Sequence, residues 1–222
     1  MRHIAKLLAQ GPRRSRNYFF VALRDSDIVG YYHATRHEAT WFLNYVAVAK
    51  MMRGMGIGEQ LLRHFEDTGQ ALGCALLELD VFESNERAYD WYLQRGYQLG
   101  SASYQVRIAI GNGYFAASGI LRWNKLAWLR AHWNETLWGF SKLDCWIGDA
   151  NVTVGLISQT TCKLLSYVGL TLEQAVAAIE RTFETQRRVL ILPNLSALPQ
   201  YNNLVGWERA LRLSKPIEVP SL

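Results

Sequence analysis

The sequence predicts a mixed α/β (α+β) fold, and two features of the chain support this. Stretches rich in aromatic and branched residues, typical of strands, alternate with stretches in which apolar residues recur at helical spacing. Half of the 222 residues are hydrophobic and 19% are charged, which is the balance of a globular chain rather than a disordered one. We therefore expect folded structure along the whole length.

The chain begins with a short helical stretch over residues 4–10, which Gly11 and Pro12 end. Three strands are predicted next. A polar turn separates the first two and a hairpin loop the last two, so we expect antiparallel pairing. The predicted strands are 17–25, 28–36 and 40–48.

The period of the apolar residues changes at residue 57. From there to residue 72 they fall near helical spacing, with charged residues on the other side, which predicts an amphipathic helix that ends near Gly73. A buried strand over 75–82 and a helix over 84–96 follow. The helix has a Ser/Asn start and a Gly stop, and a further strand is predicted over 97–110.

Glycines at 111, 113 and 119 favour a boundary, so we predict a core over residues 1–110 and a C-terminal α/β extension over 111–222. The extension either completes the fold or forms a second lobe. Its predicted elements are a helix at 120–139, a strand at 152–157, a helix at 172–186 that Thr171 opens, a strand at 187–193 and a helix at 204–213. The sequence shows no internal repeat.

The predicted helix over 120–139 carries an apolar stripe made of Trp123, Leu126, Trp133 and Leu137. Such a stripe is typical of core or interface packing, and we slightly favour the core. The alternatives are a wall of a substrate pocket and a homodimer interface, since tryptophan is common at interaction surfaces.

The positive charge is spread along the chain. Residues 1–110 hold 13 Lys/Arg against 11 Asp/Glu, and residues 111–222 hold 11 against 8, within a net charge of +5. The densest basic run, Arg13, Arg14 and Arg16, favours a solvated loop, with a phosphate contact as the alternative. We therefore expect no nucleic-acid partner.

Cys74, Cys145 and Cys162 are far apart and outside any CxxC spacing, which indicates neither a disulfide framework nor a metal site. No apolar run reaches the ~20 residues that span a bilayer, and the start lacks the pattern of a signal peptide. We expect a cytoplasmic protein without a membrane partner.

Residues 46–62 carry the most informative pattern, in which a buried strand leads into a glycine-rich turn and directly into a helix. Four N–H groups at a helix start have no partner inside the helix, and the helix dipole adds positive charge there. Gly54, Gly56 and Gly58 allow a phosphate to approach the backbone closely. The segment therefore predicts an anion-binding turn.

The spacing of this turn fits neither a Walker A loop nor a dinucleotide fingerprint. It resembles the pyrophosphate loop of the GNAT acetyltransferase superfamily, R/Q-x-x-G-x-G/A, which stands here as Arg53-Gly54-Met55-Gly56-Ile57-Gly58. The superfamily's second segment, N-x-x-A-x-x-x-Y-x-x-x-G-F/Y, is matched by Asn85, Ala88, Tyr92, Gly96 and Tyr97. The resemblance covers roughly residues 17–108.

This resemblance implies a GNAT-like central sheet with splayed strands and an N-acyltransferase that uses acetyl-CoA. The backbone of Val46, Ala47 and Val48 would pair with pantetheine, and the amides of Arg53, Gly54, Met55, Gly56, Ile57 and Gly58 would hold the pyrophosphate. Asn85 would bond the pantetheine, and Tyr92 would protonate the leaving thiolate. The acceptor would be a primary amine of a small molecule or a protein. For Tyr92 the alternative is a tyrosine that only packs in the core.

Two departures from the family pattern qualify this expectation. Only about sixteen residues precede the first matched strand, so the family's N-terminal elements are shortened, and the C-terminal extension is the obvious candidate to replace them, by adding a strand to the open edge or by packing as a separate lobe. Residues 40–48 contain no carboxylate to serve as general base, and Glu38, Glu78, Asp80 and His33 are the nearby candidates. A water or an already deprotonated amine would also serve, so no base is assigned. The alternative function is an inactive acyl-CoA-binding sensor or scaffold.

Overall fold

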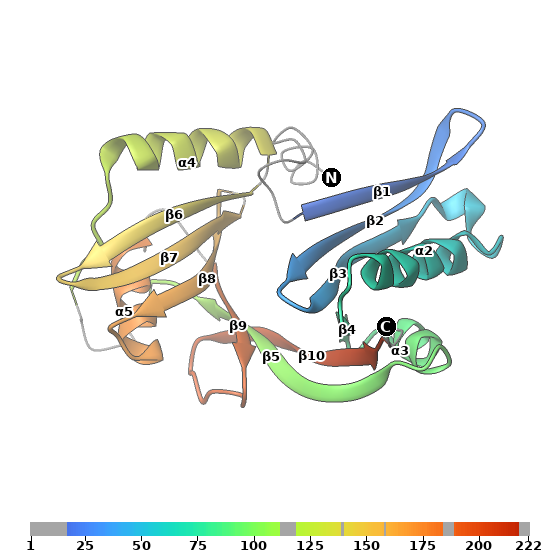
Figure 1. Cartoon of the computed structure of the whole chain (residues 1–222). Coiled ribbons are helices and arrows are strands. Elements are labelled where there is room, and N and C mark those ends of the chain that lie inside the picture. The colour runs from blue at the N-terminus through green and yellow to red at the C-terminus, as the bar shows by residue number, and fades with distance from the viewer. Residues whose placement is uncertain (1–16, 112–118, 139, 158, 184–188, 218–222) are drawn as a thin grey trace. The chain divides into compact units, whose positions relative to one another are not determined.

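The computed structural model describes residues 17–111, 119–138, 140–157, 159–183 and 189–217 (Figure 1). The predicted helix over 4–10 and the basic run at 13–16 lie outside these residues. The described chain divides into two compact units. We call residues 17–102 with 210–217 the N-terminal lobe, and residues 103–209 the C-terminal lobe.

The N-terminal lobe has a sheet in the order β1-β2-β3-β4-β10-β5. Its elements follow the predicted order, in which the first strands are followed by a helix, a strand and a second helix. The elements are β1 (Asn17–Arg24), β2 (Asp27–His37), β3 (Thr40–Val48), the 3₁₀ turn η1 (Lys50–Met52), α2 (Ile57–Ala71), β4 (Leu76–Phe82), α3 (Glu86–Leu93), and parts of β5 (Gln98–Ala109) and β10 (Leu204–Pro216).

Strands β3 and β4 are the splayed pair. They are parallel and paired from Thr40–Leu76 to Leu43–Leu79, and β3 then continues to Val48 paired with β2 but not with β4. A bulge marks the point of separation, because His33 of β2 faces Tyr45 while the next residue, Ala34, faces Leu43. The extra residue, Asn44, bends β3 away. The predicted GNAT-like sheet with splayed strands is confirmed.

Helix α2 is fixed over this parallel pair by packing and one buried hydrogen bond. Its Leu61, Leu62 and Phe65 join the core that includes Trp41 and Leu79 of the two strands. The Trp41 Nε1–H donates to the Phe65 carbonyl oxygen at 3.0 Å, which satisfies the one polar atom of a fully buried indole. The start of α2 lies beside the end of β3, since a Cβ built on Gly58 would be 3.8 Å from the Val48 Cγ2.

Strand β10 brings the last residues of the described chain into the N-terminal lobe. It pairs antiparallel with β4, from Ala210–Phe82 to Pro216–Leu76, and buries Leu211 and Leu213. The predicted helix over 204–213 is therefore wrong. The segment carries helix-favouring residues, but pairing with neighbouring strands decides its conformation, as tertiary context often overrides propensity.

The C-terminal lobe has the strand order β10-β5-β9-β8-β7-β6. The predicted strand at 152–157 is present, whereas the strands on either side of it were not predicted. Its own elements are α4 (Lys125–Trp138), β6 (Phe140–Ile147), β7 (Ala150–Ile157), β8 (Thr161–Val168), α5 (Leu172–Phe183) and β9 (Val189–Leu195).

This lobe repeats the plan of the other without repeating its sequence. Three antiparallel strands lead to a helix and then to a strand that pairs in parallel with the third, here β9 with β8 over three residues. Strand β8 also has a bulge, at Leu165, which is the fourth residue after Thr161 as Asn44 is the fourth after Thr40. The C-terminal lobe is thus a second splayed-strand fold.

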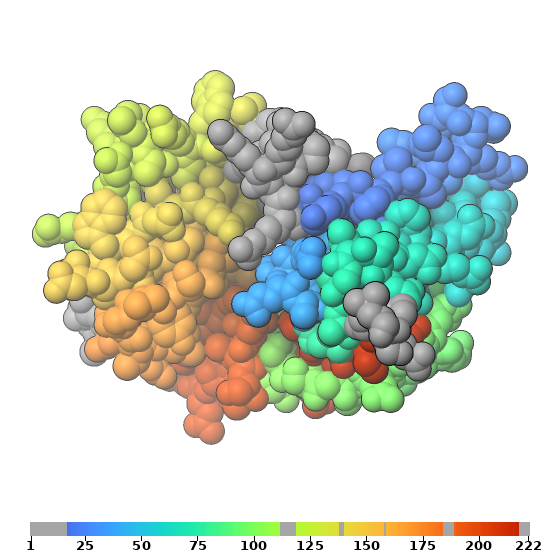
Figure 2. Space-filling model, viewed as in Figure 1, coloured from blue at the N-terminus to red at the C-terminus, as the bar shows by residue number. Residues whose placement is uncertain are grey.

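Helix α4 shows its predicted apolar stripe to solvent rather than to the core. Leu126, Trp133 and Leu137 are 64%, 67% and 47% exposed, and α4 forms part of the surface seen in Figure 2. The other side of the helix packs inward through Ala131 and Trp128. The slight preference for core packing is therefore wrong for these three. Trp123 precedes the helix and stacks on Phe183, 5.8 Å between ring centroids.

All three cysteines are free thiols in the buried parts of the lobes. Among the described helices, none combines the length and the apolarity that crossing a membrane requires.

Candidate functional site

The glycine-rich turn between β3 and α2 presents unpaired backbone amides. Gly54 and Gly56 have φ of +82° and +75°, the left-handed conformation that glycine adopts without a Cβ clash. Gly56 is the N-cap of α2 and makes no side-chain cap hydrogen bond. The Gln60 N–H reaches the Gly56 carbonyl oxygen at 3.1 Å, so the amides of the three preceding residues have no partner inside the helix. This is the geometry of an anion site.

The predicted pantetheine strand and the predicted pyrophosphate turn are contiguous. Arg53 Nε donates to the Val48 carbonyl oxygen at 3.3 Å, so the first residue of the motif folds back onto the end of β3. From Val46 to Val48 the strand has already left β4. Residues 46–48 and 53–58 thus lie together, at the mouth of the splay and the start of α2.

Asn85 begins α3, and its carboxamide oxygen accepts a hydrogen bond from the Ala88 N–H at 3.3 Å. This is an N-cap, which satisfies one of the free amides of α3. The carboxamide nitrogen is left as a donor. Asn85 therefore has a structural role that the motif alone did not indicate, and its predicted bond to pantetheine requires the nitrogen.

Tyr92 lies on the buried side of α3 and is 6% exposed. Its ring contacts Trp91 and Tyr97 edge-on, at 4.8 and 5.6 Å between centroids. Burial removes water from the phenol and disfavours its charged form, which raises the pKa of Tyr92 to about 12. At neutral pH the group is a protonated hydrogen-bond donor.

Tyr97, which contacts Tyr92, lies beside an ion pair between Glu66 of α2 and Lys215 of β10. Burial, followed by the neighbouring Glu66, raises the pKa of Tyr97 far above its ordinary value. Lys215 Nζ bonds both Glu66 carboxylate oxygens at 3.1 Å and lies 5.6 Å from the Tyr97 ring centroid. The surroundings of Tyr92 therefore depend on a lysine near the end of the described chain.

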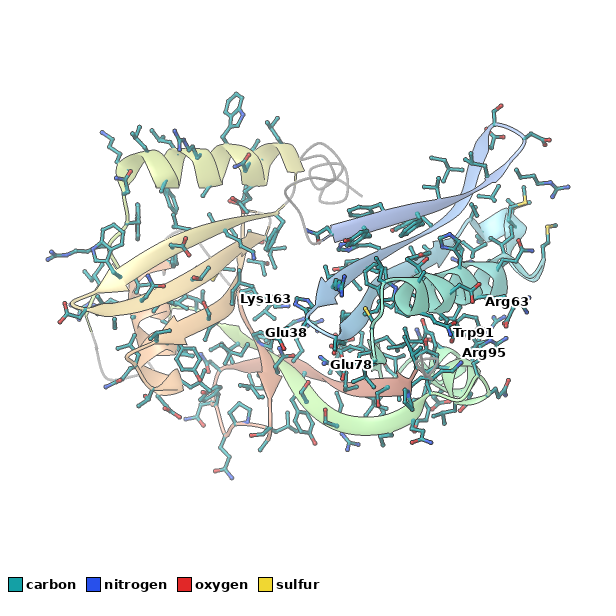
Figure 3. The ribbon with its side chains drawn as sticks, viewed as in Figure 1. Glu38, Arg63, Glu78, Trp91, Arg95 and Lys163 are labelled. Atoms are coloured by element: carbon teal, nitrogen blue, oxygen red, sulfur yellow. The ribbon has the colours of Figure 1, made fainter. Side chains whose placement is uncertain are left out.

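None of the four candidate bases lies in the glycine-rich turn, and three of them have side-chain partners. Figure 3 labels the other, Glu38, in the β2–β3 turn, together with Glu78 on β4. Glu38 sits in the β2–β3 turn with φ +51°. His33 is 4% exposed, bonds Asn17 Oδ1 at 2.9 Å and stacks on the Phe19 ring. Neither geometry points to proton transfer at the splay.

Glu78 and Asp80 lie on β4 and are both bonded to Arg212 of β10. The guanidinium holds Asp80 through two nitrogens and Glu78 through a third, at 3.3 Å. It also lies over the Phe42 ring, 4.9 Å from the centroid. Both carboxylates therefore face the arginine rather than standing free.

The corresponding place in the C-terminal lobe is built differently. Only three residues separate β8 from α5, and Thr171 caps the helix. Thr171 Oγ1 accepts from the Gln174 N–H at 3.3 Å, and Gln174 Oε1 accepts from the Thr171 N–H at 2.9 Å. This capping box occupies donors that the other helix start leaves open. The second lobe keeps the splay but has no glycine-rich anion turn.

Comparisons with known proteins agree with this geometry. Residues 3–97 match the model of the acetyltransferase (GNAT) family, which confirms the resemblance inferred from the two motifs. Over 97% of this chain the structure resembles a tandem GNAT protein from the clavulanic acid biosynthesis pathway, with a TM-score of 0.65, 11% identity and 87% of that chain covered. The chain therefore has a mixed α/β fold of the tandem GNAT type.

Two further solved structures are similar over shorter stretches. An IAA acetyltransferase from Bacillus cereus is 28% identical over 40% of this chain, with a TM-score of 0.39, and the chain spans 60% of its length. The ribosomal-protein-S18-alanine N-acetyltransferase from Escherichia coli is 21% identical over 52% of this chain and 68% of its own, with a TM-score of 0.41. Among curated proteins, none matches this sequence.

Replacing Gly56 by valine should weaken acetyl-CoA binding at least about tenfold, the factor that ~1.4 kcal/mol gives. No atom lies within 4 Å of the added Cβ, so the effect comes from the positive φ, which a branched residue does not tolerate. Calorimetric titration would give affinity and stoichiometry, which we expect to be one per chain. Gly148→Val is the matched control, since this glycine also has positive φ (+56°) and open space but lies in the β6–β7 turn. Equal affinities for Gly56→Val and wild type would exclude this turn as the donor site.

Proposed function

We propose that this chain is an N-acetyltransferase that moves the acetyl group of acetyl-CoA to a primary amine. One observation carries the proposal: β3 leaves β4 at a bulge, ends in a glycine-rich turn with unpaired amides, and leads directly into α2. A splay offers free backbone groups for a pantetheine arm, and the turn offers an anion site for its pyrophosphate. The family match over residues 3–97 supports the same activity.

The donor would lie along this segment. Backbone groups of Val46, Ala47 and Val48 would pair with the pantetheine amides, because this part of β3 has no partner on the β4 side. The amides of residues 54–58 would hold the pyrophosphate, since the Arg53 N–H already donates to the Lys50 carbonyl oxygen at 3.4 Å, and the Asn85 Nδ2 would donate to the arm. Proximity then contributes most of the rate, since the thioester is held where the amine arrives.

The transfer itself needs one bond made and one broken. The neutral amine attacks the thioester carbonyl, the carbon–nitrogen bond forms, the carbon–sulfur bond breaks, and the thiolate leaves with its electron pair. Tyr92 would donate a hydrogen bond or a proton to that thiolate. Because burial raises its pKa to about 12, it is a weaker acid than an ordinary tyrosine, and we expect a contribution at the lower end of the usual range. Water takes the proton that the amine loses.

A second candidate, a sensor that binds acyl-CoA without turnover, is favoured by one observation. The two carboxylates on β4 are both bonded to Arg212, so neither stands free as a base on that strand. Such a protein would keep the donor turn and lack amine-dependent chemistry. Only the enzyme needs an acceptor, which we propose to be an amine on a small molecule or a protein.

Thiol release from acetyl-CoA separates the two candidates. The purified chain would be incubated with acetyl-CoA and a panel of amines, including amino acids, polyamines, aryl amines, amino sugars and lysine peptides. The enzyme should release thiol above the amine-free rate with at least one class, and Gly56→Val should reduce that release at limiting donor. Tight binding of CoA with no release across the whole panel would favour the sensor.

A further inference from the structure

Glu59 places a carboxylate at the start of the helix that we propose to hold the pyrophosphate. It is the third residue of α2 and the only acidic residue of the first turn. A carboxylate there could accept hydrogen bonds from the free amides, because a helix start favours negative charge. It would then occupy the N–H donors that the pyrophosphate needs, and its charge would repel the phosphates. Glu59 makes no such bond, since Gly56 carries no side-chain cap and the carboxylate turns elsewhere.

Arg95, just after the end of α3, forms an ion pair with this carboxylate. Its Nε and Nη2 both donate to Glu59 Oε2, in an ion pair whose side chains are 25% and 40% exposed. The remaining nitrogen, Nη1, donates to the Trp91 carbonyl oxygen at 2.8 Å. The guanidinium also lies over the Trp91 ring, 4.4 Å from its centroid. All of its nitrogens are used, so the arginine is fixed in place.

We propose that Arg95 is a positioning residue that holds the Glu59 carboxylate off the phosphate-binding amides and neutralises its charge, which lets the turn accept the pyrophosphate of acetyl-CoA. The inference rests on the proposed function and assigns a role that the motif does not contain. An unpaired carboxylate a few ångströms from a pyrophosphate would repel it through the partly exposed surroundings. Figure 3 shows Arg95 and Trp91 together at α3, near α2.

Two further charged groups lie on this side of α2: the exposed Arg63, four residues after Glu59, and Glu66, seven residues after it, which bonds Lys215. Glu59 and Arg63 have the spacing of a helix i,i+4 pair, which contributes little on an exposed surface. The competing explanation for the Arg95 contact is structural, since the ion pair also ties α3 to α2. A double-mutant comparison separates charge neutralisation from such a tie.

The experiment measures CoA dissociation constants by calorimetry for wild type, Arg95→Met, Glu59→Gln and the double variant, at low and high salt. Arg95→Met should bind about tenfold more weakly at low salt, and less so at high salt, which screens the exposed carboxylate. Glu59→Gln should bind at least as tightly as wild type. The double variant should return to within about threefold of wild type, because the repelling charge is gone. Arg95→Lys, which keeps the charge, should lie between.

A double variant as weak as Arg95→Met, or an Arg95→Met protein with wild-type affinity, would overturn the inference. If Arg95→Met fails to fold, Glu59→Gln and Arg95→Lys still decide, since weaker binding in Glu59→Gln contradicts a repelling carboxylate. The proposed function fails separately: wild type would then not bind CoA, or Gly56→Val would bind it unchanged. Melting temperatures of all variants report whether the tie between α2 and α3 matters for folding.

Discussion

A chain that ends at Arg209 should lose both cooperative unfolding and acetyl-CoA binding. The deletion removes the half of β10 that pairs with β4, along with the buried Leu211 and Leu213. It also removes Lys215, which bonds Glu66 beside Tyr97. The N-terminal lobe would expose an open, apolar sheet edge, the usual cause of aggregation. Thermal unfolding and calorimetric titration would measure the two losses.

A point variant tests the same strand without shortening the chain. Leu213→Asp places a charge at a fully buried position and should destabilise the fold by several kcal/mol, enough to unfold most marginally stable domains. Val205→Asp on the same strand is the control, since this residue is 60% exposed.

Truncation near Ile110 also removes β10 and should likewise cause aggregation or loss of cooperative unfolding. It tests the predicted division into residues 1–110 and 111–222. A monomeric, cooperative truncated chain that still bound CoA would make the C-terminal region a separate domain.

Tyr92→Phe should lower kcat about a hundredfold while the affinity for acetyl-CoA changes by less than about twofold. The substitution keeps the ring that packs between Trp91 and Tyr97 and removes only the donor hydroxyl. General acid catalysis contributes typically about 10²–10⁴-fold, and a thiolate is a fair leaving group, so the lower end is expected. Saturation kinetics with acetyl-CoA and the best amine of the panel separate kcat from KM. Tyr89→Phe, on the same helix, is a matched control.

The pH dependence gives Tyr92 a second test. A donor must keep its proton, and the raised pKa of about 12 moves the loss of that proton to higher pH than for an ordinary tyrosine. From pH 7 to 10 the wild-type rate should therefore show no fall caused by this group, and the variant should follow the same profile at a lower level. Weaker CoA binding with normal turnover at saturation would make Tyr92 a packing residue.

The N-terminal lobe was predictable because its signals are local. The strand from Thr40 to Val48 and the start of α2 at Ile57 agree with the prediction to the residue. The strand rich in branched residues, the glycine-rich turn and the amphipathic helix each have a sequence pattern only a few residues long. Both motifs, at residues 53–58 and 85–97, lie in this lobe. The confirmed family resemblance and the confirmed splay both concern it.

The C-terminal lobe was predicted less well, although its first strands pair locally. Strands β6 and β7 form a hairpin around Gly148 and Asp149, and the alternating polar and apolar residues of β6 are a strand signal that the prediction missed. Strand β10, which pairs with the distant β4, was mistaken for a helix. The repeated plan is visible in the bulges at Asn44 and Leu165, which no sequence pattern marks. The missing glycine turn before α5 removes the one motif that would have revealed the second fold.

The contacts that shape the site were also hidden from the sequence. Arg212 meets Asp80 across 132 positions of chain, and Arg95 meets Glu59 across 36. Nothing near either arginine indicates its partner, because ion pairs between elements are fixed by strand order and helix packing. The N-cap at Asn85, in contrast, is a local signal, and the predicted Ser/Asn helix start already pointed to it.

Mass spectrometry of the products of one reaction tests the central claim most directly. Wild-type chain would be given acetyl-CoA labelled with deuterium in the acetyl group, together with an amine from the panel that promotes thiol release. The account predicts one deuterated acetyl group on the amine nitrogen for every thiol released, and about tenfold less of this product with Gly56→Val at limiting donor. Thiol release with free acetate and an unmodified amine, or CoA bound without any acetylated product, would contradict it.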